Sequence, residues 1–377
     1  MDETLSKKII ITTSIICLLG IIMVFDASMG LIAQRYHYIT FQAIWVLLGT
    51  LLAYITYRSN YKIFQRFAFL LWILCLIALI VVFVFSAKIN GSQRWLNILG
   101  FTSFQPSEIT KLVFIIYLSS LFTKLHTKYK GEIKSATDNF KKILLPYLIV
   151  TIITCLFIIA GKDMGTTIIL ATISIFIFII SDNFGYIWMN LSLTGILFGL
   201  SSIVLVIIAP YRLQRLLTYL KGSNQSQNYI QGAGYQVHQI LIAIGSGGLL
   251  GVGFTQSIQK NQYLVGTTAI TDSIFAVIAE EIGLIGALLV ISLYIYLVYL
   301  IFKVAINSKD YFGKLLVSGI ASWIGIQAFI NIAANIGIIP LTGVPLPFIS
   351  YGGSSIVVLL ISIGLVLNIE KFNNEEN

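Results

Sequence analysis

The chain has 377 residues, of which 57% are hydrophobic and 10% charged, and its mean hydropathy is +0.91. Soluble domains usually have about 25% charged residues, so this composition excludes an ordinary soluble protein and indicates a multi-pass membrane protein. The formal net charge is +9, but no nucleic-acid-binding motif accompanies it. We attribute the excess of Lys and Arg to cytoplasmic loops and to contacts with anionic membrane lipids, and we expect no nucleic-acid partner.

The first apolar segment follows Lys7 and Lys8, and no small-residue cleavage site comes after it. We therefore interpret it as a retained first helix, not a cleaved signal peptide. Each of the three cysteines lies inside an apolar stretch, and the three histidines are scattered. These positions predict neither a disulfide framework nor a metal site built from His or Cys.

An all-α fold is expected, because the chain consists largely of apolar segments of roughly the length, about 20 residues, that a spanning helix needs. The pattern predicts ten spanning helices in a single integral membrane domain, 1–377. The ten segments are 9–27, 38–57, 67–87, 109–123, 144–160, 164–181, 186–208, 274–302, 314–339 and 354–369.

The orientation of these spans follows from the distribution of Lys and Arg. An even number of spans puts both termini on one side, and the loops on that side carry most of the basic residues. The positive-inside rule therefore places both termini in the cytoplasm.

Three loops fall on the opposite, extracytoplasmic side. The first is 88–108, and the second, 209–273, is a large loop between the seventh and eighth spans. Such long loops are usually functional. Within the large loop, 236–250 is apolar enough to lie in the membrane interface or to re-enter the membrane. The third loop, 340–353, is rich in proline and glycine, and such backbone is tolerated at membrane depth only where it lines a cavity or is buried in protein.

Asp272 follows Thr271 at the start of the eighth predicted helix. One interpretation is a helix N-cap, which Asp and Thr commonly provide. The other is a general base, since a carboxylate at a partly dehydrated helix start could accept the proton of a sugar hydroxyl. Glu280 and Glu281 lie about two turns deeper. They are interpreted either as ion-paired packing groups or as the polar wall of a cavity.

Several cationic residues have two interpretations each. Lys111 follows Glu108 by three residues, so the two share a helix face and form either a local ion pair or a patch that binds a pyrophosphate or sugar. Arg212 and Arg215 lie at the outer end of the seventh span. They either reach lipid headgroups or bind a diphosphate. Arg94, beside a tryptophan, is similarly an interfacial anchor or a substrate ligand.

These motifs together resemble the SEDS family, the FtsW/RodA polytopic glycosyltransferases of bacterial cell-wall synthesis, and they are more similar to the FtsW branch. The resemblance covers most of the chain. Its motifs are Gly91-Ser92-Gln93-Arg94-Trp95, Phe104-Gln105-Pro106-Ser107-Glu108 with Lys111, Asp163-Met164-Gly165-Thr166, Tyr211-Arg212-Leu213-Gln214-Arg215, Gly232-Ala233-Gly234-Tyr235-Gln236, Ile244-Gly245-Ser246-Gly247-Gly248, Gln259-Lys260, Thr271-Asp272 and Pro345-Leu346-Pro347-Phe348-Ile349-Ser350-Tyr351-Gly352-Gly353-Ser354-Ser355.

The resemblance implies a peptidoglycan polymerase that uses lipid II in the bacterial cytoplasmic (inner) membrane. The family's essential aspartate maps to Asp272, which would be the catalytic base. The predicted substrate-binding residues are Arg94, Glu108, Lys111, Arg212, Arg215, Gln259, Lys260, Ser350 and Tyr351. The family also implies a divalent cation, Mg or Mn, with no organic cofactor. Its expected partners are a class B penicillin-binding protein and the proteins of the divisome or elongasome.

The sequence departs from the family pattern near the predicted base. Thr268 and Ile270 stand where the family has glutamate and histidine, and Ser273 replaces the usual phenylalanine. Two other functions stay open on the sequence alone: a flippase for lipid-linked precursors, and a non-catalytic scaffold that activates a penicillin-binding protein. A flippase needs a polar path through both leaflets, whereas the charges here concentrate toward the outer side.

Overall fold

The computed structural model describes residues 3–30, 35–86, 94–98, 102–129, 132–181, 186, 188–195, 199, 235–264 and 268–375. These residues are almost entirely helical, and the sheet they contain is one antiparallel hairpin of β1 (Leu96–Ile98) and β2 (Thr102–Phe104). The predicted all-α class is confirmed, with this hairpin as a small addition. The helices are α1 (Glu3–Ala27), α2 (Arg35–Arg58), α3 (Lys62–Phe85), α4 (Pro106–Tyr129), α5 (Ala136–Asn139), the π-helical turn Phe140–Leu144, α6 (Leu145–Ala160), α7 (Met164–Ile180), α11 (Tyr235–Gly247), α12 (Ile258–Gln262), α13 (Ile274–Asn307), α14 (Tyr311–Asn335) and α15 (Gly353–Glu375).

Eight helical segments among the described residues are long and apolar enough to cross a membrane. The predicted sixth span corresponds to the shorter apolar helix α7. The predicted seventh span, 186–208, lies mostly outside the described residues, although 188–195 within it are helical. The chain is thus a multi-pass membrane protein. The eight segments are Leu5–Ala27, Tyr36–Arg58, Lys62–Phe85, Pro106–Tyr129, Ala136–Ala160, Ile274–Asn307, Tyr311–Asn335 and Gly353–Asn374.

The helices form a bundle with α14 at its centre. Of the most apolar window of α14, 78% is buried, against 11% for α2, so α14 is surrounded by protein while α2 presents its surface outward. Helix α14 packs against α4, α7, α13 and α15. Gly319 permits the close approach to α4 and α7, since a Cβ there would lie 2.5 Å from Cγ2 of Ile115. Small residues are the usual means of close packing between membrane helices.

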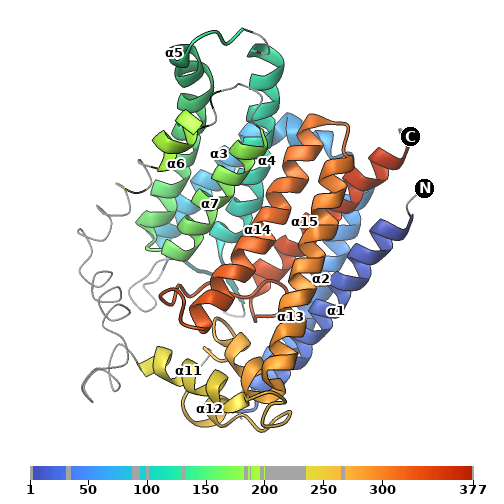
Figure 1. The fold of residues 1–377 in the computed structure, drawn as a ribbon, viewed down its shortest axis with the longest axis vertical. Coiled ribbons are helices and arrows are strands. Elements are labelled where there is room, and N and C mark those ends of the chain that lie inside the picture. The colour runs from blue at the N-terminus through green and yellow to red at the C-terminus, as the bar shows by residue number, and fades with distance from the viewer. Residues whose placement is uncertain are drawn as a thin grey trace.

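Both termini lie at one end of the bundle, and α11 and α12 lie at the opposite end (Figure 1). This arrangement agrees with an even number of crossings. It also separates the described part of the predicted large loop from the termini. The structure omits 200–234 and 265–267, so the extent of the 209–273 loop stays a prediction.

Helix α13 is interrupted where a continuous helix was expected. Gly283 has φ 73°, a left-handed conformation that favours glycine. The segment 248–253, which follows α11, is hydrogen-bonded across the break. Its N–H groups donate to the carbonyls of Glu280 at 2.9 Å and Glu281 at 3.1 Å, and the N–H of Leu284 donates to one of its carbonyls at 2.9 Å. The segment thus satisfies backbone groups that the interruption leaves without helical partners.

Candidate functional site

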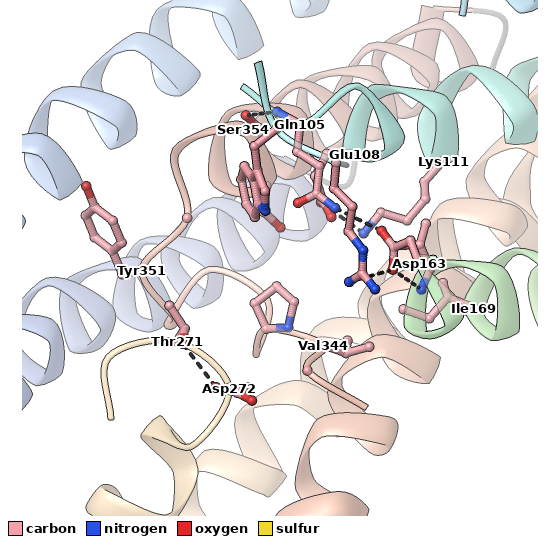
Figure 2. Close-up of a pocket in the computed structure, with 17 residues that line it drawn as sticks. Gln105, Glu108, Lys111, Asp163, Ile169, Thr271, Asp272, Val344, Tyr351 and Ser354 are labelled. Atoms are coloured by element: carbon pink, nitrogen blue, oxygen red, sulfur yellow. Dashed lines mark hydrogen bonds and ion pairs between the residues drawn. The ribbon is translucent and has the colours of Figure 1, made fainter. Parts of the chain in front are cut away.

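A polar pocket of about 360 Å³ lies among the N-terminal ends of several helices. Much of its lining comes from the first residues of α4, α7 and α15. Thr271 and Asp272, which lie just before α13, also line it. Arg94 and Trp95 complete the lining, together with the loop 340–352, which we call the pocket loop. Asp272 lies on one side of the pocket, and Glu108, Lys111 and Asp163 lie on the other (Figure 2).

The convergence of four helix starts gives the pocket a preference for anions. The first turn of a helix exposes backbone N–H groups and the positive end of the helix dipole. Such ends are common binding sites for phosphate and carboxylate groups. The cationic side chains of Arg94 and Lys111 add to this field, so the pocket suits a substrate that carries phosphate.

Asp272 is a pocket residue and does not cap α13 with its side chain. The residue at the N-cap of α13 is Ser273, and it makes no side-chain capping hydrogen bond. The Asp272 carboxylate accepts a hydrogen bond from Oγ1 of Thr271, 3.0 Å from its Oδ1. Of the two interpretations of Asp272, the geometry favours a carboxylate that is presented to the pocket.

The pocket loop is hydrogen-bonded to the backbone just before Asp272. The hydroxyl of Ser350 donates to the carbonyl of Thr271 at 2.5 Å, and the N–H of Tyr351 donates to the carbonyl of Ile270 at 2.8 Å. The Ser350 hydroxyl also accepts from the N–H of Leu346 at 2.8 Å. Ser350, predicted to bind substrate, therefore holds the loop around Asp272, while Tyr351 both holds it and lines the pocket.

Tyr351 carries a neutral phenol at the edge of this site. Burial raises its pKa to about 12, and the nearby Tyr38 adds to the shift. The two rings pack edge to face, with centroids 5.0 Å apart. The Tyr351 hydroxyl is thus a hydrogen-bonding group at neutral pH, not an anion.

Glu108 and Lys111 form the predicted ion pair and also line the pocket. The Lys111 ammonium lies 2.9 Å from Oε2 of Glu108, and it donates to Oε1 of Gln327 at 2.8 Å. It also lies 5.1 Å from the centroid of the Trp323 ring. Both members of the ion pair are almost fully buried. The local ion pair of the first interpretation is present, and it lies at the edge of the pocket. The binding of a pyrophosphate or sugar by the pair stays a prediction.

Arg94 is directed into the pocket by the turn between α6 and α7. Its Nε donates to the carbonyl of Gly161 at 3.3 Å, and its Nη2 donates to the carbonyl of Lys162. Its Nη1 lies 3.6 Å from Oδ1 of Asp163. Asp163 caps α7 by accepting from the N–H of Thr166. Asp163, which was not among the predicted site residues, thus orients a cationic one.

Gln259 and Lys260 do not line this pocket. The Lys260 ammonium is fully buried, 2.6 Å from both carboxylate oxygens of Asp26, and is also ion-paired with Glu281. The N–H of Gln259 donates to Glu280 at 3.4 Å. The Lys260 ammonium thus joins α1, α12 and α13 through two carboxylates. The substrate-binding role predicted for Gln259 and Lys260 stays a prediction. The same contacts show that Glu281 is ion-paired and Glu280 is a buried hydrogen-bond acceptor.

Arg212 and Arg215 lie outside the described residues, so their predicted role in binding a diphosphate stays a prediction.

The carboxamides of α14 contact the site, and the motifs did not indicate them. Gln327, Asn331 and Asn335 are spaced by four residues and buried on one helix face. Asn331 and Asn335 both donate to the carbonyl of Asp272, each at 2.9 Å. Three carboxamides at helical spacing inside an apolar span are a signal that sequence reasoning could have used.

The departures from the family pattern lie in a hydrogen-bonded turn before α13. The carbonyl of Thr268 accepts from the N–H groups of Thr271 at 3.2 Å and Ser273 at 3.0 Å. Ile270 is fully buried. The turn is therefore closed by its backbone and does not depend on the glutamate and histidine side chains of the family pattern.

The described residues include no group of three or more His, Cys, Asp or Glu side chains placed to hold a metal ion. Glu108 and Asp163 already face Lys111 and Arg94. Magnesium commonly keeps several waters and binds through one or two carboxylates together with substrate phosphates. Among the described residues of the pocket, Asp272 is the carboxylate that would face such a cation, and a phosphate-bearing substrate would supply most of the other ligands.

Comparison with known proteins gives a consistent family. A family model described as "Cell cycle protein", covering FtsW, RodA and SpoVE, matches residues 6–375. The probable peptidoglycan glycosyltransferase FtsW of Coxiella burnetii is 37% identical over 370 residues, covering 96% of this chain and 95% of that protein. The stage V sporulation protein E of Bacillus subtilis is 32% identical, covering 97% and 96%.

Solved structures share the fold. A chain from a peptidoglycan synthase complex, described for its coordination of polymerization and crosslinking, superposes with a TM-score of 0.78 at 23% identity, covering 97% of each chain. The rod shape determining protein RodA of Thermus thermophilus superposes with a TM-score of 0.67 at 22% identity, covering 97% and 96%. With the family model and the relatives matched over nearly their whole length, these findings confirm the resemblance seen in the motifs: the chain belongs to the SEDS family of FtsW, RodA and SpoVE proteins.

Proposed function

We propose that this protein is a peptidoglycan glycosyltransferase that polymerises lipid II at the outer face of the bacterial cytoplasmic membrane, with both termini in the cytoplasm. The observation that carries the proposal is the pocket, in which the Asp272 carboxylate faces Lys111 and Arg94 among four helix starts. The names of the FtsW relatives support the same activity.

In the proposed reaction, Asp272 is the general base. It accepts the proton of the acceptor sugar's 4-hydroxyl while that oxygen attacks the anomeric carbon of the donor. The bond from that carbon to the lipid diphosphate breaks, the diphosphate leaves with the bonding electrons, and the configuration inverts. Lys111, Arg94 and the helix N-termini stabilise the negative charge on the leaving group.

A divalent cation is a further part of the proposal. When bound with the substrate diphosphate, it would supply additional neutralisation of the leaving group. We expect chelation with EDTA to abolish polymerisation and added Mg²⁺ or Mn²⁺ to restore it. Full activity in EDTA would mean that Lys111, Arg94 and the helix starts suffice.

The proposed partner is a class B penicillin-binding protein that crosslinks the new glycan within the divisome or elongasome. The description of the matched synthase complex, which couples polymerization to crosslinking, supports this choice. Co-purification of the two membrane proteins tests it.

The deciding experiment measures glycan chains formed from purified lipid II by the protein with its partner. Asp272→Ala is compared with Asp138→Ala, since Asp138 makes only a partly exposed ion pair with Lys142, at 3.9 Å. We expect chains from wild type and Asp138→Ala but not from Asp272→Ala. Equal amounts of glycan chains from all three proteins would mean that a residue other than Asp272 is the base. No chains from any, beside an active relative, would favour the flippase or the scaffold function.

A further inference from the structure

Helix α14 carries a row of buried carboxamides on the face that meets the pocket loop. Gln327, Asn331 and Asn335 follow one another at intervals of four residues, and each is at most 1% exposed. A buried amide costs free energy unless it is hydrogen-bonded. The partners of this row therefore indicate which parts of the molecule it holds together.

The two asparagines converge on one backbone carbonyl. Nδ2 of Asn331 donates to the carbonyl of Asp272 at 2.9 Å and to that of Val344, in the pocket loop, at 2.7 Å. Nδ2 of Asn335 donates to the same Asp272 carbonyl at 2.9 Å and to the carbonyl of Asn331 at 2.9 Å. A carbonyl oxygen has two lone pairs, so the two donors saturate it.

This carbonyl belongs to a peptide that α13 itself does not orient. The helical hydrogen bonds of α13 begin at the carbonyl of Ser273, which accepts from Ala276 and Val277. Ser273 has φ −105° and ψ 11°, outside the helix. The peptide plane after Asp272 helps to set the direction of its Cα–Cβ bond, together with the plane before it. The α14 carboxamides thus hold this plane from outside the turn.

The same row reaches the cationic side of the pocket. Oε1 of Gln327 accepts from Lys111 at 2.8 Å and from Nε1 of Trp323 at 2.7 Å, and its Nε2 donates to the carbonyl of Pro345 at 3.0 Å. Along α14, the eight residue steps from Gln327 to Asn335 span about 12 Å at 1.5 Å per residue. One rigid helix face therefore contacts the lysine, the pocket loop and the backbone of the predicted base.

We infer that Asn331 and Asn335 are positioning residues that hold the Asp272 carboxylate at a fixed place relative to Lys111. The base, Asp272, and the cation that stabilises the leaving diphosphate, Lys111, can then act together on one bound substrate. The inference rests on the proposed polymerase function and deepens it. Misplacement of a reacting group by about 1 Å can cost about a hundredfold in rate. Substrate affinity depends on other contacts, so the effect falls on kcat.

The test compares Asn331→Leu, Asn335→Leu and the double variant, because leucine has nearly the shape of asparagine but donates no hydrogen bond. Asn368→Leu is the matched control. Asn368 is equally buried, and its Nδ2 donates to the carbonyls of Tyr57, at 2.6 Å, and Ser59, away from the pocket lining. The measurements are kcat and KM for lipid II polymerisation, together with thermal unfolding in detergent.

Because either asparagine alone still holds the carbonyl, we expect each single variant to lower kcat by less than about tenfold and the double variant by about a hundredfold or more, beyond the product of the singles. KM should change by less than about threefold in all of them. Asn368→Leu should lose thermal stability comparably and keep the wild-type kcat.

A double variant with wild-type kcat, or one whose loss Asn368→Leu matches, overturns the inference. If the double variant does not fold, the two single variants decide. A single variant that loses as much thermal stability as Asn368→Leu, but whose kcat is no lower than that of Asn368→Leu, contradicts the inference. The wild type separates the two proposals. An inactive wild type contradicts the polymerase function and this inference with it, whereas an active wild type with an unaffected double variant contradicts this inference alone.

Discussion

Two buried lysines illustrate how residues are used in this protein. Lys111 and Lys260 are both almost inaccessible, and each is paired with carboxylate. Lys111 faces one carboxylate and keeps an edge on the pocket, whereas Lys260 is enclosed by Asp26 and Glu281. A charge in a membrane bundle requires such partners, and of the two lysines Lys111 is the one that lines the pocket.

Lys111→Met should abolish polymerisation and also destabilise the fold. It leaves the buried Glu108 without its cation, which typically costs about 3–5 kcal/mol. The double variant Glu108→Gln/Lys111→Met removes both charges. We expect it to regain most of the thermal stability but none of the activity, as measured by unfolding in detergent and by lipid II polymerisation. Activity in the double variant would contradict a role for the Lys111 charge in the reaction.

Lys260→Met should act on stability first. Its removal leaves Asp26 and Glu281 buried together without a cation, and we expect a loss of about 3–5 kcal/mol. The control is Lys142→Met, whose partly exposed pair with Asp138 predicts a change below about 1 kcal/mol. Thermal unfolding of both variants provides the comparison. Equal melting temperatures would show that the Lys260 cluster contributes no more than a surface pair.

At the scale of elements, the site is made by helix ends and by an interrupted helix. Helices α4, α7, α13 and α15 all begin at the pocket, so their dipoles act on the same volume. Helix α13 is divided at Gly283, and its first turns bind the 248–253 segment through backbone hydrogen bonds. The part of α13 nearest Asp272 is therefore tied to the segment after α11 as well as to the rest of its own helix.

Gly283→Ala should prevent this arrangement. Gly283 has φ 73° and ψ −168°, and an added Cβ would lie 2.3 Å from the backbone nitrogen of Gly251. We expect a destabilisation of at least about 3 kcal/mol, from backbone strain and the collision together. Gly325→Ala in α14 is the control, because its Cβ would meet only ordinary contacts at 3.4 Å. A Gly283→Ala protein as stable as Gly325→Ala would show that the break adapts.

At the scale of the whole molecule, the two ends of the helix bundle carry different elements. The termini and α5 lie toward one end, and α11 and α12 lie at the other (Figure 1). The positive-inside rule assigns the terminal end to the cytoplasm, since the basic loops between spans gather there. With this proposed orientation, the proposed lipid II substrate would reach the pocket from the outer leaflet.

Cysteine labelling tests this orientation. The three native cysteines are buried, so they should give little background. Phe254→Cys, at an exposed position between α11 and α12, should react with a membrane-impermeant maleimide in cells stripped of any outer envelope. Glu132→Cys, exposed between α4 and α5, should react only after permeabilisation. The reverse pattern would invert the proposed topology.

The sequence by itself determined the membrane class, most of the spans and part of the site. Apolar segment length and the three-residue spacing of Glu108 and Lys111 are local properties, which need no knowledge of distant contacts. The motif pattern also placed Asp272 at a helix start, and the structure presents it to the pocket.

The tertiary structure alone decided what lies opposite each polar side chain. Lys260 stood in a motif like those of the pocket residues, yet its partners come from Asp26, 234 positions earlier in the chain, and from Glu281. The asparagines of α14 donate to a carbonyl about 60 residues away in the chain. The helix break at Gly283 is filled by the separate segment 248–253. The free energy of a buried polar group depends on its spatial neighbours, and these are set by how the helices pack.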